Sequence, residues 1–392
     1  MNEEALQGIA NDIQQCLDTG ALDLAEAKAR EVLASGTGPL NIWHMLAHAV
    51  RRQGRIEEAK VLQEMMLEHL PQNVGLRFEL AETLLLLGEF DRGWREYRFR
   101  YSLPHTTSLE RKVQTHRWDG APIAGKTLLI HDEQGFGDTL QFIRMVPWVK
   151  KRSQASIVLQ ISPELASFGR RIPGADKVII RGELPGSFDV HCEMMSLPMA
   201  LKLQISDLPG EIPYLRPDSA RLNIWRKKLA SIRGPKIALV WAGRPTHLND
   251  ANRSVDLAQL APLAAGNKDV TFLSVQKGPR SDDVNRSPEN MKIVNLSDEI
   301  QDFEDTAAIL SLADLLISVD SSPAHLAGAL GRPVWTMLPF VPDWRWLMSR
   351  PDTPWYPDMR LFRQKQFGNW QDVVSEMAKA IPEFLKSRAW GK

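Results

Sequence analysis

The sequence predicts two architectures in one chain: an all-α repeat region of about three helix pairs, followed by an α/β region of two doubly wound parallel sheets that face a cleft. Three observations predict this fold class. The first hundred residues repeat with a period of 34, and short apolar strands alternate with amphipathic helices from Lys126 onward. In addition, a buried strand runs directly into a helix within residues 315–330. The 392 residues are enough for two or three domains with full cores.

Glycines recur at one position of the 34-residue repeat. Gly20, Gly54 and Gly88 are 34 residues apart, and the same offset aligns small and apolar residues around them. A period of 34 with these columns resembles the tetratricopeptide repeat, in which two helices turn at the glycine. The first repeat is degenerate or a cap, because Asp12 stands in a column that is otherwise leucine. We therefore expect helical repeats over residues 1–104.

The repeat region has two possible roles. Arrays of this kind hold an extended peptide or a partner helix on their concave face, which predicts a protein partner or a protein substrate. The alternative is a dimerisation module or a purely structural one. His44 and His48 lie four residues apart on one predicted helix, but no third ligand stands nearby, so we predict no metal ion. Residues 105–125 are expected to link the repeats to the α/β region.

The α/β region divides into two blocks at a proline-spaced stretch, residues 208–213. The first block, 126–212, is short against the ~150 residues of an ordinary domain, so we expect the repeat array to dock beside it and complete the cleft. The second block, 213–392, ends in a closing helix. The predicted strands are 127–131, 157–161, 178–180 and 188–191 in the first block, and 237–241, 270–275, 293–295, 315–319 and 334–338 in the second.

A glycine-bracketed loop follows the first predicted strand. Gly135 and Gly137 allow a tight turn and the close approach of a ligand. The spacing fails as a dinucleotide fingerprint because its third small residue is missing, and this disfavours NAD binding. Asp138 then opens a helix at the carboxyl edge of the sheet. It either faces the cleft as a general base or only caps the helix.

The strand at 315–319 leads into a candidate anion site. It is followed by Asp320, Ser321, Ser322 and Pro323. Proline is favoured in a first helical turn, and the free N–H groups and the positive end of the helix dipole attract a phosphate there. We therefore expect a nucleotide as the ligand. An ordinary strand-turn-helix corner is the alternative.

Polar side chains gather around this predicted anion site. Arg244, Arg253 and Lys277 lie in loops that leave the same edge of the sheet, so we expect them near the phosphates, although each alone is typical of a solvated surface. His325, one turn into the helix, contacts phosphate or ribose, or is a satisfied core histidine. Asp320 orients backbone N–H groups or contacts the ribose.

Composition disfavours several classes of function. Lys plus Arg and Asp plus Glu both number 48, so no basic excess attracts nucleic acid. The acidic amino terminus is unlike a secretory signal, and no apolar run is long enough for a membrane span, so we expect a cytoplasmic protein. Cys16 and Cys192 are too few for a disulfide framework or a CxxC zinc site.

Several segments together carry a resemblance. They are QGFGDTLQF, VWAGRPTHLNDANRS, SVQKG, DFEDTAAILSLADLLISVDSSPAHLAGALGRPVW, and PDWRW with PWYP. With them the chain resembles bacterial tetratricopeptide-repeat glycosyltransferases, whose catalytic half is similar to the heptosyltransferase family, glycosyltransferase family 9. The resemblance implies a GT-B fold of two Rossmann-like halves, with the donor bound to the second. It also implies inverting, metal-independent transfer from a nucleotide sugar, with no further cofactor.

The resemblance assigns roles to single positions. Asp138 matches the base of that family. The expected donor contacts are Arg244, Arg253, Gln276, Lys277, Asp320, Ser321, Ser322 and His325, and the expected acceptor-side loop contains Gly135, Gly137 and Gln141. The aromatic residues Trp344, Trp346, Trp355 and Tyr356 form a platform for sugar or base, or they seal the catalytic region against the repeats or the closing helix.

Two functions follow as hypotheses. The first is a glycosyltransferase that moves a sugar from a nucleotide sugar onto a protein, such as flagellin or another surface protein, or onto a glycan. The second is a repeat-based binding protein whose transferase half has lost turnover. The sequence indicates neither the donor nor the acceptor.

Overall fold

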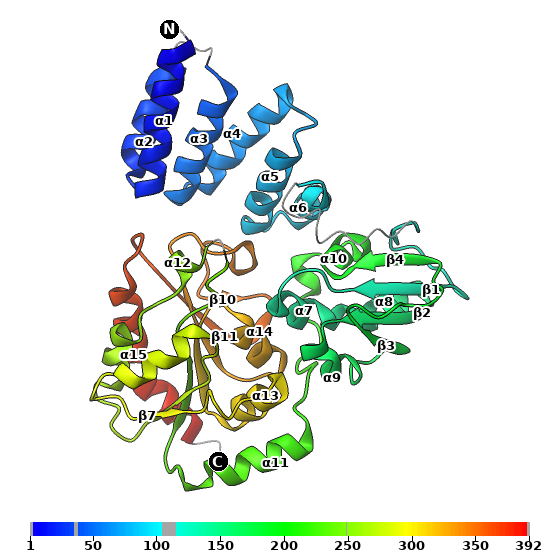
Figure 1. Ribbon diagram of the computed structural model, residues 1–392, viewed down its shortest axis with the longest axis vertical. Helices are drawn as coiled ribbons and strands as arrows, with labels where there is room; N and C mark the ends of the chain where they lie inside the picture. The colour runs from blue at the N-terminus through cyan, green and yellow to red at the C-terminus, as the bar shows by residue number, and fades with distance from the viewer. Residues whose placement is uncertain (1–2, 35–37, 104–114, 248, 390–392) are drawn as a thin grey trace. The chain divides into compact units, whose positions relative to one another are not determined.

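The computed structural model describes residues 3–34, 38–103, 115–247 and 249–389 (Figure 1). The chain divides into two compact units. The helical unit comprises Met1–Arg111 with the short segment Val341–Ser349, and the α/β unit comprises Lys112–Phe340 with Arg350–Lys392. The domain boundaries expected at 104, 125 and 212 stay predictions. Residues 105–114 of the expected linker lie outside the described residues.

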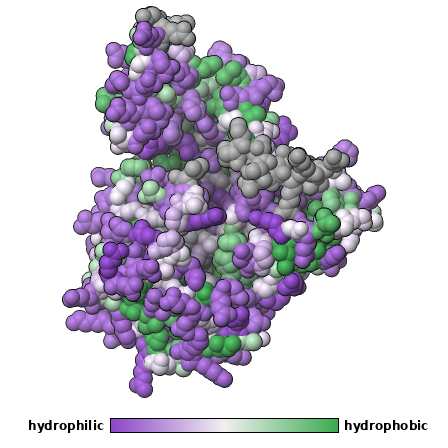
Figure 2. Space-filling view, viewed as in Figure 1, coloured by the Kyte–Doolittle hydropathy of each residue, from purple (hydrophilic) through white to green (hydrophobic). Residues whose placement is uncertain are grey.

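The amino-terminal hundred residues form consecutive helix pairs that turn at the predicted glycines. Gly20, Gly54 and Gly88 have φ angles of +79°, +80° and +83°, a left-handed conformation that side chains disfavour. Ala25 and Ala59 are fully buried, so the helices of a pair approach closely. The surface over the first two helices is mostly hydrophilic (Figure 2). The helices are α1 (Glu3–Thr19), α2 (Leu22–Leu33), α3 (Leu40–Arg52), α4 (Ile56–His69), α5 (Val74–Leu86) and α6 (Phe90–Tyr97).

The first half of the α/β unit is a four-stranded parallel sheet with the order β3-β2-β1-β4. Its central strand is apolar on both faces, since Leu128, Leu129 and Ile130 are at most 1% exposed. The strands are β1 (Thr127–His131), β2 (Ser156–Ile161), β3 (Lys177–Ile180) and β4 (Val190–Glu193). The helices are α7 (Phe136–Phe142), α8 (Val146–Ser153), α9 (Ala166–Gly169) and α10 (Leu197–Leu201).

The second half contains a seven-stranded sheet with the order β10-β11-β9-β8-β5-β6-β7. All its pairs are parallel except β10 with β11. From β5 the chain continues to β6 and β7 on one side, then crosses to β8 and β9 on the other side. The strand order therefore reverses between β5 and β8, which form the switch point of a Rossmann-like order. The strands are β5 (Lys236–Val240), β6 (Thr271–Ser274), β7 (Ile293–Asn295), β8 (Leu315–Val319), β9 (Val334–Leu338), β10 (Asp352–Thr353) and β11 (Tyr356–Arg363). The helices are α11 (Ser219–Lys228), α12 (Asp250–Arg253), α13 (Phe303–Leu312), α14 (Ser322–Ala329) and α15 (Trp370–Ala389).

Strand β11 was not expected from the sequence. Prolines at 351, 354 and 357 favour an extended loop, yet β11 pairs with β9 over five residue positions, from Met359 with Val334 to Arg363 with Leu338. The helical region and the two parallel sheets otherwise confirm the predicted fold class. No helix in the part of the chain that the structure describes is both long and apolar enough to cross a membrane.

The segment Val341–Ser349, which follows β9, belongs to the helical unit. Its Trp344 is 2% exposed and packs edge-on against Trp94 of α6, with ring centroids 5.1 Å apart. Trp346 in the same short turn is completely buried, and the turn packs against α5. These two rings therefore cover the last helix pair, which matches the burial role that the sequence left open for them.

Candidate active site

The carboxyl ends of β5 and β8 meet at the switch point of the second sheet. After β8, Ser321 is the N-cap residue of α14 and Pro323 stands in its first turn. The Ser321 side chain does not cap the helix, and its hydroxyl lies 3.1 Å from the hydroxyl of Ser318. The first backbone N–H groups of α14 therefore point to the sheet edge without a side-chain cap from Ser321, an arrangement suited to a phosphate.

Arg253 places its charged guanidinium beside the amino end of α14. Its Nη1 donates to the backbone oxygen of Asp320 at 3.0 Å, and its side chain is only 14% exposed. The guanidinium lies against Gly243, where a Cβ would come within 2.5 Å of Nη2. Glycine at 243 thus makes room for the arginine. Arg244, the next residue in the loop, is exposed.

Gln276 and Lys277 follow β6, but their side chains bind backbone. The buried Gln276 accepts from two amides just after β5, both at 3.0 Å. The Lys277 ammonium donates to the backbone oxygens of Ser297 at 2.7 Å and Ile300 at 3.0 Å. Their expected role as donor contacts stays a prediction. Both side chains hold loops at the sheet edge in place.

The residue predicted to be the base lies in the first turn of α7. Gly135 is the N-cap residue, and Oδ2 of Asp138 accepts from the Gly135 amide at 2.8 Å. The capping role is thus present. A carboxylate has two oxygens with about four acceptor positions, so this bond does not prevent a contact with an acceptor hydroxyl. Gln141, expected in the acceptor-side loop, lies fully buried in α7, and its expected role there stays a prediction.

Helix α7 of the first half and α14 of the second half contact each other at their amino ends. A Cβ added to Gly137 would lie 3.0 Å from Cδ2 of His325 and 3.6 Å from Cα of Ser322. Glycine therefore permits this close approach. Phe136 adds an edge-on contact with Phe303, with ring centroids 5.2 Å apart. The structure thus brings the Asp138 loop and the amino end of α14 together.

His325 lies buried between these helix ends, at 4% exposure. Its Nδ1 is 2.9 Å from the hydroxyl of Tyr356 in β11. Its Nε2 is 3.9 Å from Oδ1 of Asp320, which is too long for a hydrogen bond. Sequence analysis counted Tyr356 among the aromatic candidates but did not indicate its contact with His325, because that contact depends on the packing of β11 beside α14.

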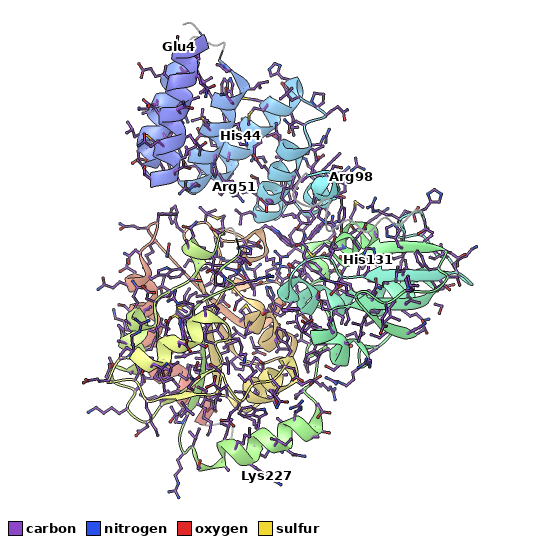
Figure 3. All side chains as sticks on the ribbon, in the orientation of Figure 1. Glu4, His44, Arg51, Arg98, His131 and Lys227 are labelled. Atoms are coloured by element: carbon purple, nitrogen blue, oxygen red, sulfur yellow. The ribbon has the colours of Figure 1, made fainter. Side chains whose placement is uncertain are left out.

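A second polar cluster lies where β1 and β4 end, at His131 (Figure 3). Ligand atoms of His131, His191 and Glu193 lie within 4.8 Å of one another, near enough for one metal ion. The two ring planes are only 20° apart, with centroids 5.4 Å apart and Nε2 of His131 3.1 Å from Nδ1 of His191. This is the geometry of a direct hydrogen bond. Nε of Arg117 also donates to Oε1 of Glu193 at 2.8 Å. The two histidines therefore bind each other, and the carboxylate binds Arg117.

A cavity of about 410 Å³ opens at the same edge of the second sheet. It lies between the α12 region and the turn before α15, and its lining includes Asp250, Ser254, Arg280, Gln364 and Phe367. None of the predicted donor contacts lines this cavity. The amino end of α14 is therefore separate from this cavity.

Residues 263–338, which include β8, α14 and β9, match the family described as glycosyltransferase family 9 (heptosyltransferase). The protein FlbA of Caulobacter vibrioides is 26% identical over 340 residues, which cover 81% of this chain and 56% of FlbA. The chain thus spans little more than half the length of this curated relative.

Two solved structures are similar to the α/β unit. Heptosyltransferase II of E. coli, described as an ADP-heptose lps heptosyltransferase, has a TM-score of 0.51 at 14% identity and covers 67% of this chain and 99% of its own. A glycosyl transferase family 9 protein of Veillonella parvula has a TM-score of 0.49 at 12% identity and covers 68% of this chain and 99% of its own. The first likeness confirms the predicted GT-B fold of two Rossmann-like halves.

Proposed function

We propose that this chain, in which residues 263–338 match glycosyltransferase family 9, is an inverting glycosyltransferase that uses a nucleotide sugar and no metal ion. The observation that carries the proposal is the contact between α7 and α14 at Gly137. It brings the helix end that carries Asp138 to the amino end of α14, the proposed phosphate cradle, where Ser321 and Ser322 lie. Inverting transfer needs both parts, a base for the acceptor and an anion site for the leaving group.

In the proposed reaction, the Asp138 carboxylate takes the proton of the acceptor hydroxyl while that oxygen attacks the anomeric carbon. The bond from the anomeric carbon to the phosphate oxygen breaks, and the nucleoside diphosphate leaves with the electron pair. Attack opposite the leaving group inverts the anomeric configuration. A placed carboxylate accelerates such a step by about 10² to 10⁴.

The charge of the departing diphosphate is met by protein groups. They are the backbone N–H groups in the first turn of α14, the positive end of its dipole, and the guanidinium of Arg253 beside Asp320. The exposed Arg244 adds a second cation on the same loop. These groups supply the stabilisation that a divalent ion supplies in other transferases. The proposal therefore contains no cofactor beyond the donor.

The acceptor in this proposal is a protein, such as flagellin or another surface protein, or a glycan. The helix pairs support it, because stacked pairs of this kind bind peptides on their concave face. We place the reaction in the cytoplasm. Cys16 and Cys192 are both buried free thiols, which fits a reducing compartment.

One observation favours a second candidate, a repeat-based binding protein without turnover. The Asp138 carboxylate already caps α7 through the Gly135 amide. A cap alone stabilises a helix by about 1 kcal/mol and requires no chemistry.

Replacing Asp138 by Asn separates the two candidates. Asn keeps an oxygen for the Gly135 amide but cannot take a proton, so transfer should fall about 10² to 10⁴-fold while nucleoside diphosphate affinity stays within a few fold. Asp218→Asn is the matched control, because Asp218 caps α11 by accepting from the Arg221 amide. If the unmodified chain turns over no UDP-, ADP-, GDP- or CMP-linked sugar, the binding protein is the better account.

A further inference from the structure

The cavity of about 410 Å³ beside α12 has no part in the proposed reaction. Its volume lies in the range of about 300–1,000 Å³ that is typical of small-molecule pockets. Exposed residues of α12 and of the turn between β11 and α15 line it, and so do buried residues that directly follow β9 and β11. The cavity is therefore bounded by several elements of the second half, and the chemistry of its lining indicates what it can hold.

Gln364, which follows β11, lines this cavity and carries a donor without a partner. The side chain is 4% exposed, and its Oε1 accepts from the Gly368 amide at 2.9 Å and the Phe340 amide at 3.2 Å. A backbone amide can only donate, so these two bonds identify the oxygen of the side chain and leave its NH₂ group at the other position. Nε2 has no hydrogen-bond partner among the residues that the structure describes. A buried donor without an acceptor is unfavourable, so a ligand oxygen that accepts from Nε2 would bind favourably here.

Two carboxylates supply acceptors to the same cavity. Oδ1 of Asp250 accepts from the Ser254 hydroxyl at 3.1 Å, and Oδ1 of Asp256 accepts from Nη2 of Arg280 at 2.7 Å. A carboxylate offers about four acceptor positions, so both groups can also accept from ligand hydroxyls. Two carboxylates against the one guanidinium of Arg280 leave the described lining negative, which disfavours a phosphate.

Aromatic and aliphatic rings complete the lining. Phe367, in the turn between β11 and α15, is 47% exposed, and the buried Pro339 and Trp370 add apolar surface. The cavity thus combines a partly exposed aromatic ring, a buried amide donor and carboxylate acceptors. Pockets for small molecules have this composition, in which apolar surface surrounds a few polar groups that fix orientation.

We propose that this cavity binds a neutral saccharide unit of a glycan. A pyranose ring has C–H faces that pack on an aromatic ring such as Phe367, and its hydroxyl groups both donate to carboxylates and accept from the Gln364 amide. The sugar of a nucleotide donor carries a phosphate on its anomeric carbon, and the negative lining disfavours it. Oδ1 of Asp250 lies 3.4 Å from Nε of Arg253, so the saccharide would be bound next to the cation of the proposed cradle. This binding goes beyond the proposed function, because it requires neither donor nor turnover.

Saturation-transfer NMR on the full-length chain tests the proposal. The probes are the methyl glycosides of glucose, N-acetylglucosamine and rhamnose, each without nucleotide. We expect the ring protons of at least one glycoside to receive saturation from the protein at millimolar concentration. The signals should persist when UDP, ADP or UDP-glucose is added, because the donor site lies outside the cavity.

Two variants connect the binding to the lining. Gln364→Glu keeps an oxygen for the Gly368 and Phe340 amides but replaces the donor by an acceptor, so saccharide affinity should fall about tenfold. Phe367→Ala removes a ring from an exposed turn and should weaken binding to a similar degree while thermal stability stays unchanged. Ile224→Ala is the matched control, because Ile224 is 48% exposed on α11 and does not line the cavity.

The outcomes separate this proposal from the proposed function. Absence of saturation transfer to any of these glycosides, equal affinity of Phe367→Ala and Ile224→Ala, or displacement of the glycoside by UDP, ADP or UDP-glucose overturns the inference. Failure of the proposed function has a different signature, which is a chain that still binds the saccharide but transfers no sugar from any donor.

Discussion

The first sheet and the inner strands of the second sheet share one strand order, β3-β2-β1-β4 in the first and β7-β6-β5-β8 in the second. At the first switch point the strands end in buried side chains, His131, His191 and Glu193, which bind each other and Arg117. At the second switch point, β8 is followed by short hydroxyl side chains and the amino end of α14. The same topology therefore leads to the proposed anion site only at the second switch point, where the Ser321 side chain does not cap α14.

The largest effect is expected from the contact that joins the two halves. Gly137→Ala places a methyl group 3.0 Å from His325, so α7 and α14 must move apart by a few tenths of an ångström or more. Displacements of about 1 Å cost about 10²-fold in rate, and we expect a loss of transfer that approaches this value. Steady-state kinetics would measure it. Gly8→Ala, where nothing lies within 4 Å, is the control, and equal activity of both variants would contradict the role given to this contact.

A smaller effect is expected at the amino end of α14. Ser321→Asp places an acidic N-cap on α14, which should stabilise the helix by about 0.5–1 kcal/mol. The same charge should repel a diphosphate and weaken the binding of UDP or ADP by about tenfold or more. Calorimetric titration would show the weaker nucleotide binding, and thermal unfolding would show the higher stability. Unchanged affinity would place the phosphates elsewhere.

The smallest effect concerns the paired cluster of the first sheet. Burial opposes ionisation of Glu193, but the Arg117 charge, the hydrogen bonds to this carboxyl and the nearby His131 together lower its pKa. Because the pKa in the folded state lies below the usual value of 4.5, the charged carboxyl stabilises the fold at pH values above 4.5. This stabilisation is lost as the pH falls through the lowered pKa. Glu193→Gln should therefore lose about 1–2 kcal/mol at pH 7 and less at pH 3. Denaturant unfolding at both pH values tests this, and an equal loss at both would contradict it.

The sequence predicted those parts of the site that one continuous segment forms. Strand β8, Ser321 and α14 are adjacent in the chain, and so are β1, Gly135 and α7, so strand and cap signals located both helix ends. The roles expected for Asp138 and Arg253 stay predictions. The sequence did not indicate that the amino ends of α7 and α14 touch, because this contact depends on the packing of two separate sheets.

Sequence patterns could not predict which groups the individual side chains contact. Gln276 and Lys277 have the polarity of ligand contacts, yet they bind backbone oxygens and amides of neighbouring loops. Tyr356 was expected in a proline-rich loop and lies instead at the start of β11, where strand pairing brings it to His325. Trp344 was expected to bind sugar or base or to seal against the repeats, and it packs against Trp94 of the helical unit. These contacts join residues far apart in the chain, for which local periodicity carries no information.

A crystal structure of the full chain with UDP or ADP tests the central claim most directly, namely that the α14 cradle and the Asp138 loop form one site. The account predicts phosphate oxygens about 3 Å from backbone nitrogens in the first turn of α14, beside Arg253 and facing the Asp138 loop. A diphosphate bound at the His131 and His191 cluster, or bound at α14 with Asp138 turned away from it, would contradict the account.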